Sequence, residues 1–205
     1  MCIRDSTWNE LRGVECITFE QMPQRKQQIT VSRSFPREIH TLEELERIVA
    51  EFASMCAEKL RAEHSVCREV QCYLLTNRHR EEQPQRCVTG LSLIPDPTDS
   101  SLELVRQARI ALRQIFQPGY GYKKAGVLLA QITPASELQG SLFTPAEHEK
   151  HARLMKVLDA VNKSCGKGRL VVAAQGTEPF RMNREHLSPR YTTDWRELLV
   201  VKATK

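Results

Sequence analysis

The sequence predicts an α+β fold in which a four-stranded sheet carries two helices on one of its faces. Between residues 28 and 132, segments with the two-residue period of strands and segments with the three-to-four-residue period of helices follow in the order βαββαβ. Strand, helix and strand taken twice is the split βαβ, or ferredoxin-like, plan. Many functions use this plan, so the function must be sought in the residues on its surface.

The first strand, residues 28–35, indicates how the faces of the sheet are used. Its apolar and hydroxyl side chains alternate, with Ile29, Val31 and Phe35 on one face and Thr30, Ser32 and Ser34 on the other. A face of small hydroxyls is not typical of a sheet buried on both sides. We therefore expect helices on one face and a polar partner on the other. Arg33 breaks the alternation near the strand end, where its side chain can reach the rim.

Helix signals and apolar periods place the remaining elements of this unit. Capping boxes at Thr41–Glu44 and Ser100–Glu103 predict where the two helices begin, and Pro118-Gly119 predicts where the second one stops. In the second strand, residues 66–76, Val70, Cys72 and Leu74 are expected to face inward. In the third strand we expect Leu91 and Leu93 to face inward and Gly90 and Ser92 to face outward. The fourth strand, residues 122–132, begins with Lys123 and Lys124.

The predicted outer face suits a nucleic-acid backbone. Its side chains are short, and cations surround them: Thr30, Ser32, Ser34, Gly90, Ser92 and Gly126, with Arg33, Arg86, Lys123 and Lys124 around them. Hydroxyls and backbone amides beside cations can contact phosphates closely without reading base edges. The competing interpretation is a solvated sheet face with incidental cations. An RNA-binding module is the other alternative, but it requires aromatic residues on the central strands, and the third strand, RCVTGLSL, has none.

A tether, residues 133–144, and a small C-terminal unit, residues 145–205, follow the sheet. The tether contains Gln139-Gly-Ser-Leu-Phe143, whose two large apolar side chains either dock back on the chain or anchor a short peptide in a pocket of a partner. A capping box at Thr144–Glu147 predicts a helix, and strand-like segments at 170–174 and 198–201 complete a small α/β unit.

Composition and motifs exclude several functional classes. No apolar run approaches the roughly 20 residues that cross a bilayer, so we expect no membrane partner. The seven scattered cysteines contain no C-x-x-C pair and are interpreted as reduced thiols of a cytoplasmic protein. His148 and His151 lie one helical turn apart, but no second pair completes a metal site. The sequence has neither a nucleophile elbow nor paired strand-end carboxylates, so we expect no active site and no cofactor in this chain.

Several motifs together resemble a known family. The segments LRGVEC, ITVSRSF, AEKLRAEH, YKKAGVLL, QGSLF and LSPRYTT occur in the order found in the UmuC family, the catalytic subunits of DNA polymerase V-type enzymes. These are Y-family translesion DNA polymerases of the bacterial SOS response. The resemblance extends from about Trp8 to Lys202, and ordered agreement of several motifs is more specific than any one of them.

The resemblance implies a role for each part. Residues 7–27 are similar to the end of the thumb and its linker, residues 28–132 to the little finger that binds DNA, and residues 145–205 to a UmuC-type C-terminal domain. It implies contacts to the primer–template backbone by Thr30, Ser32, Arg33, Ser34, Arg86, Lys123 and Lys124. QGSLF resembles a motif for the β sliding clamp, in which Gln139 makes polar contacts and Leu142 and Phe143 fill the pocket.

The same resemblance implies what we expect to lie outside this chain. The palm and its magnesium ions belong to a longer parent polymerase, so this chain should bind DNA and the clamp without polymerising nucleotides. UmuD′ and RecA are further partners that the family implies. Residues 1–6 match no motif and are interpreted as foreign or artefactual sequence.

Overall fold

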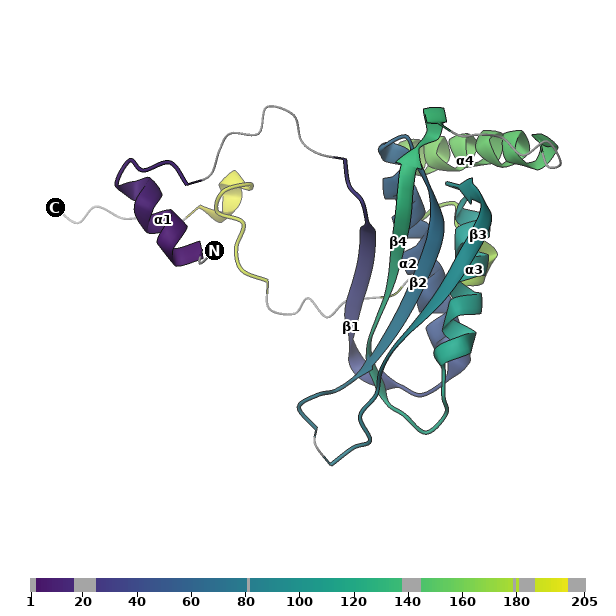
Figure 1. Ribbon diagram of the computed structural model, residues 1–205, viewed down its shortest axis with the longest axis horizontal. Coiled ribbons are helices and arrows are strands. Elements are labelled where there is room, and N and C mark those ends of the chain that lie inside the picture. The colour runs from purple at the N-terminus through teal and green to yellow at the C-terminus, as the bar shows by residue number, and fades with distance from the viewer. Residues whose placement is uncertain are drawn as a thin grey trace.

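The computed structural model describes residues 3–16, 25–80, 82–137, 145–178, 180 and 187–198. Its first helix, α1 (Ile3–Leu11), precedes the βαββαβ unit and is drawn to one side of the sheet in Figure 1. The unit itself consists of β1 (Ile29–Ile39), α2 (Leu42–Ala62), β2 (Ser65–Thr76), β3 (Cys87–Thr98), α3 (Ser101–Ile115) and β4 (Tyr122–Pro134). The predicted element order is therefore confirmed. The helix α1 includes residues 3–6, so it continues into the segment that was set aside as foreign, and it ends just before Gly13, whose φ is +81°.

The four strands form one antiparallel sheet in the order β1-β4-β2-β3. Strand β4 lies between β1 and β2, and β2 lies between β4 and β3, so each strand–helix–strand unit is split by a strand from the other. The split plan expected from the sequence is present, but β4 and β2 are its central strands, so the third strand, expected to be central, lies at an edge. The two edge strands are β1 and β3, and β1 continues through Pro36, which an edge strand tolerates because its outer amide positions need no ladder partner.

Helices α2 and α3 cover one face of the sheet, and the core lies between them and the strands (Figure 1). The apolar stripe of α2 supplies Leu45, Val49, Phe52, Cys56 and Leu60, all at most 1% exposed. The sheet supplies the inward residues predicted from alternation, which are Ile29, Val31, Phe35, Val70, Cys72 and Leu74, together with Val127 and Leu129 of β4. Because the helices occupy this face alone, the opposite face of the sheet is left uncovered by them.

The predicted orientation of β3 is wrong. Gly90 and Ser92 face the helices, whereas Leu91 and Leu93 are 46% and 60% exposed on the other side. A Cβ at Gly90 would lie 2.4 Å from the carbonyl oxygen of Ala111, so the glycine permits α3 to approach the strand closely. Ser92 Oγ donates to Gln107 Oε1 of α3 at 2.6 Å. A shift of one residue moves every side chain of a strand to the opposite face of the sheet. In β3 the close packing of α3 determines which side chains face the helices.

The capping boxes mark the correct helix starts but not the predicted hydrogen bonds. Thr41 and Ser100 are the N-cap residues of α2 and α3, yet neither side chain caps its helix. Ser100 is fully buried, and its Oγ has no partner among the described residues. Leu102, in the first turn of α3, is 37% exposed. The third box, at Thr144–Glu147, lies outside the residues whose side chains the structure describes.

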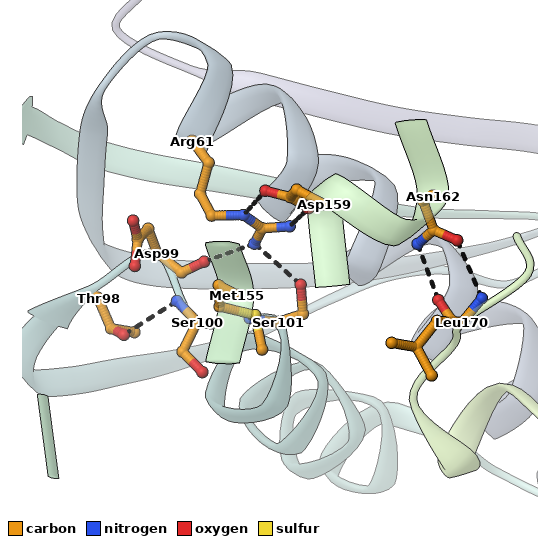
Figure 2. Close-up of polar contacts among 9 residues, drawn as sticks. All are labelled: Arg61, Thr98, Asp99, Ser100, Ser101, Met155, Asp159, Asn162 and Leu170. Atoms are coloured by element: carbon orange, nitrogen blue, oxygen red, sulfur yellow. Dashed lines mark hydrogen bonds and ion pairs between the residues drawn. The ribbon is translucent and has the colours of Figure 1, made fainter. Parts of the chain in front are cut away.

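The C-terminal unit docks on the helix layer through α4 (Pro145–Cys165), at the point where α2 ends and α3 begins. Met155 of α4 is 1% exposed and accepts a hydrogen bond from the Ser101 amide at 3.3 Å (Figure 2). Asn162 holds the following segment by exchanging two hydrogen bonds with the backbone of Leu170, as Figure 2 also shows.

Beyond α4 the chain runs along α2. Gln175 Nε2 donates to Ser54 Oγ at 2.6 Å, and the ring of Phe180 packs edge-on against Phe35 and Phe52. The strand expected at residues 170–174 is absent, because residues 173–175 form a 3₁₀ turn and residues 170–172 pair with no strand. A second 3₁₀ turn occupies Trp195–Glu197, and of the final expected strand only Leu198 is described, as a bend. The described part of this unit is thus helical, not α/β. None of the described helices is long and apolar enough to cross a membrane.

Candidate nucleic-acid interface

The uncovered side of the sheet, which we call the open face, is built from three complete cross-strand rows. The register aligns Ser34, Lys124, Leu75 and Cys87 in the first row, Ser32, Gly126, Tyr73 and Thr89 in the second, and Thr30, Leu128, Gln71 and Leu91 in the third. Successive rows are two residues apart on each strand, so all of these side chains share one face. The hydroxyl face predicted for the first strand is therefore part of a wider surface that four strands share.

Four of the seven residues predicted to contact DNA lie on this face. Thr30 and Ser34 are exposed, Ser32 is half-buried, and Lys124 is placed beside Ser34 by the register of β1 and β4. These residues come from the two neighbouring strands β1 and β4. Together they form a hydroxyl edge with one ammonium group, which is an arrangement that can receive phosphate oxygens.

The other three predicted residues have different surroundings. Lys123 lies at a register shift in β4, and its Nζ donates to the carbonyl oxygen of Pro36 at 2.9 Å. Arg33 lies two residues from Val31 and two from Phe35, which both face the helices, so it belongs to the helix-covered side of the strand. Its Nη1 donates to the carbonyl oxygen of Ser32 at 2.7 Å. These two cations lie at the β1 margin rather than within the open face.

Arg86 directly precedes β3. It lies four residues before Gly90, which faces the helices, so alternation places Arg86 on the helix-covered side as well. Its guanidinium carbon lies 5.4 Å from the centroid of the Tyr120 ring, and its Nη2 lies 3.5 Å from the carbonyl oxygen of Ile115, the last residue of α3. A cation at the C-terminal end of a helix is stabilised by the helix dipole. This packing gives Arg86 a structural role on the helix side of the sheet.

Sequence reasoning missed Tyr73, which lies near the centre of the open face. The position that a Cβ of Gly126 would occupy lies 2.3 Å from Tyr73 Cζ. The ring of Tyr73 therefore lies low across Gly126, in space that any other residue at that position would fill. The period-two pattern of β2 assigned Tyr73 to the outer face, but the glycine partner on β4 could be found only from the register.

The open face is not uniformly polar. Leu91 and Leu93 on β3 are exposed, and Leu75 on β2 and Leu128 on β4 are half-buried on the same face. Glu69 accepts hydrogen bonds from Gln71 and Gln131 at 2.5 Å and 2.9 Å, so this carboxylate is held by two neutral amides. The hydroxyl and ammonium groups are consequently concentrated on the β1 and β4 side of the face.

The structure also shows where the cysteines lie and whether described side chains could bind a metal ion. The six described cysteines are free thiols, and burial raises the pKa of Cys56, Cys67 and Cys72 to about 12. Cys87, on the open face, and Cys165, at the end of α4, are exposed. Among the described residues there is no group of three side chains that could hold a metal ion.

Gln139, Leu142 and Phe143 of the predicted clamp motif lie outside the described residues.

The fold and the open face define a class of protein: an α+β module whose two helices leave one side of its sheet uncovered. The family follows from comparison of the sequence. The model described as the impB/mucB/samB family C-terminal domain matches residues 26–142, more than half of the chain. The chain belongs to this family, and the resemblance to UmuC-type proteins is confirmed. A second model, described as a domain of unknown function (DUF4113), matches residues 152–201.

Curated relatives agree with this assignment. The chain is 39% identical to Protein ImpB of Salmonella typhimurium over 198 residues, which cover 96% of this chain and 46% of that protein. It is 37% identical to Protein UmuC of Salmonella typhimurium strain LT2, with 98% and 48% covered, and 37% identical to Protein MucB of Escherichia coli, with 96% and 46% covered. The chain thus spans about half the length of the relatives that it matches.

Two solved structures are more distantly similar. One is the complex of beta-clamp processivity factor and little finger domain of PolIV, with 18% identity, a TM-score of 0.37, and coverage of 57% of this chain and 99% of that one. The other is the insertion ternary complex of Dbh DNA polymerase, with 9% identity, a TM-score of 0.40, and coverage of 52% and 29%.

Proposed function

We propose that this chain is the DNA-backbone-binding and sliding-clamp-binding part of a Y-family translesion DNA polymerase that acts in SOS damage tolerance in the cytoplasm. Membership of the impB/mucB/samB family supports the proposal that the parent protein is such a polymerase. The open face supports the proposed DNA-binding role of this chain. The observation that carries the proposal is the hydroxyl edge of Thr30, Ser32 and Ser34 beside Lys124, on the side of the sheet that α2 and α3 leave uncovered. Such groups contact phosphates without reading sequence.

The catalytic part of the activity is assigned to the rest of the parent polymerase. Its palm and magnesium ions would perform nucleotide transfer, while this chain would hold the primer–template backbone. UmuD′ and RecA stay predictions of the family resemblance, and we assign no described residue to either of them.

Salt-dependent binding to duplex DNA tests the DNA contact. We expect sequence-independent affinity for a primer–template duplex that falls steeply as salt rises, because bound cations release counterions from DNA. Lys124→Ala should weaken binding on every sequence and reduce the slope of log K against log salt by about one. The matched control is Lys59→Ala, an exposed lysine on α2 in the helix layer, which should leave the slope unchanged. Equal slopes for both variants and the unchanged chain would refute the assigned face.

Clamp capture tests the tether. Replacing Leu142 and Phe143 together by alanine should abolish capture by the β sliding clamp and leave DNA affinity intact, because apolar anchors supply most of the energy of such a peptide contact. A control pair is Leu154→Ala with Val157→Ala, which truncates two exposed apolar side chains on α4. Retention of clamp capture by the first variant would show that the motif is not the anchor.

A further inference from the structure

The hydroxyl group of Tyr73 and the side chain of Ser32 approach each other in the middle row of the open face. The position of a Cβ on Gly126 would lie 2.5 Å from Tyr73 Oη and 2.7 Å from Ser32 Cβ. The two side chains, from the non-adjacent strands β2 and β1, therefore meet over the glycine on β4 that separates them. Without the glycine, the Tyr73 ring could not lie down across β4.

These hydroxyls have no hydrogen-bond partner within the described part of the chain, although both residues are half-buried. Tyrosine hydroxyls in partly apolar surroundings usually find a partner. Leu75 and Leu128 flank the ring in the neighbouring rows, and Lys124 lies in the next row toward the 77–86 hairpin. Two neutral donors, with a lysine in the neighbouring row, match the oxygens of a phosphodiester, which accepts hydrogen bonds from hydroxyl and ammonium groups alike.

We propose that Tyr73 is a DNA-contact residue whose hydroxyl, together with that of Ser32, binds a backbone phosphate, and that Gly126 is the positioning residue that holds the ring low enough to do so. This inference rests on the proposed function and adds a specific contact to it. The hydroxyl pair is uncharged, so it contributes affinity without releasing a counterion. Loss of the hydroxyl pair should therefore leave the salt dependence of DNA affinity unchanged, whereas loss of Lys124, which contributes through charge, should reduce it.

The decisive variant is Tyr73→Phe in the full chain, measured on a primer–template duplex across a range of salt. We expect affinity to fall about tenfold at every salt concentration, as for loss of a hydrogen bond to a charged group, with the salt slope unchanged. Lys124→Ala should instead lower the slope. Tyr120→Phe removes a hydroxyl from the ring that packs with Arg86 on the helix side, and it serves as the control with unchanged binding.

The outcomes separate this inference from the proposed function. If Lys124→Ala weakens binding and Tyr73→Phe does not, the DNA face stands and the Tyr73 contact is overturned. If neither variant changes binding, both are overturned. If Tyr73→Phe keeps full affinity but Tyr73→Leu loses it, the ring stacks on nucleic acid and the hydroxyl contact is again overturned.

Gly126→Ala tests the positioning role. The added methyl would displace the Tyr73 ring, so we expect a loss of affinity similar to that of Tyr73→Phe, with the unfolding midpoint measured to confirm that the variant is folded. Because both changes remove the same contact, the double variant should bind no more weakly than Gly126→Ala alone. Additive losses would contradict the positioning role.

Discussion

Arg61 of α2 and Asp159 of α4 form a bidentate ion pair, with Nε and Nη2 each 2.7 Å from a carboxylate oxygen. The third guanidinium nitrogen, Nη1, donates to the Asp99 carbonyl oxygen and to Ser101 Oγ at 2.9 Å and 3.0 Å (Figure 2). The Arg61 side chain is 10% exposed. One guanidinium therefore joins the end of α2, the start of α3 and the docked helix α4. The segment matched by the domain of unknown function is attached to the family domain at this point.

Asp159→Asn should loosen this attachment. The change leaves the nearly buried Arg61 without its charge partner, and we expect the free energy of unfolding to fall by about 2 kcal/mol, since hydrogen bonds to charged groups contribute at this scale. Amide hydrogen exchange in α4 should accelerate. The matched control is Glu149→Gln on the same helix, whose ion pair with Arg153 is highly exposed and should contribute almost nothing. Equal effects of the two variants would contradict the role of Arg61.

Gly90→Ala should be strongly destabilising. The new methyl group would lie 2.4 Å from the Ala111 carbonyl oxygen and 2.9 Å from Ile115 Cγ2, so α3 would have to move away from β3. We expect a loss of about 1–3 kcal/mol in unfolding free energy, measured by chemical denaturation, as for overpacking in a core. Thr89→Ala, at the exposed neighbouring position, is the control and should change stability little. An unaffected Gly90→Ala protein would show that β3 does not have the setting described above.

Glu46 makes the link between α2 and α3 dependent on pH. Its carboxylate accepts hydrogen bonds from Arg109 Nη2 at 2.6 Å and from Arg113 Nε at 2.5 Å. Burial alone would raise the pKa of Glu46, but the hydrogen bonds and charges of Arg113 and Arg109 outweigh it and hold the pKa below its ordinary value of 4.5. A lowered pKa in the folded state gives a contribution to stability that is complete above 4.5 and is lost as pH falls through the folded-state pKa.

The corresponding variant is Glu46→Gln. It should reduce unfolding free energy at neutral pH and show a shallower decline below pH 4.5 than the unchanged chain. Denaturation curves at a series of pH values provide the measurement. The same decline in both proteins would mean that Glu46 does not contribute to the acid sensitivity.

The sequence predicted the element order and most inward-facing residues because apolar periodicity is a local property. The α2 stripe and the inward residues Val70, Cys72 and Leu74 needed no knowledge of neighbouring strands. The setting of β3 could not be obtained in the same way, because Leu91 and Leu93 look like core residues until Gly90 is seen to receive α3. A glycine within a strand can signal close backbone approach, and this signal was present.

The candidate site was predictable only in part for a similar reason. Thr30, Ser32 and Ser34 could be assigned to one face because alternation within a strand is local, whereas the register of β1 and β4 places Lys124 beside Ser34. The convergence of Tyr73 on Gly126 and Ser32 depends on β4 pairing with both β1 and β2, which sequence spacing does not reveal. Docking of α4 was also hidden, since the pairing of Arg61 with Asp159 joins residues 98 positions apart.

The natural thiols of the chain provide the most direct test of the central claim that the open face binds the DNA backbone. Cys87 lies in the row of Lys124 and Ser34, whereas Cys165 is exposed at the end of α4, and Cys56, Cys67 and Cys72 are buried. Alkylation rates of each thiol should be measured by mass spectrometry with and without duplex DNA. The account predicts that DNA slows alkylation of Cys87 in proportion to the fraction bound and leaves Cys165 unchanged. Unaltered Cys87 reactivity on saturated DNA, or protection of Cys165 instead, would contradict it.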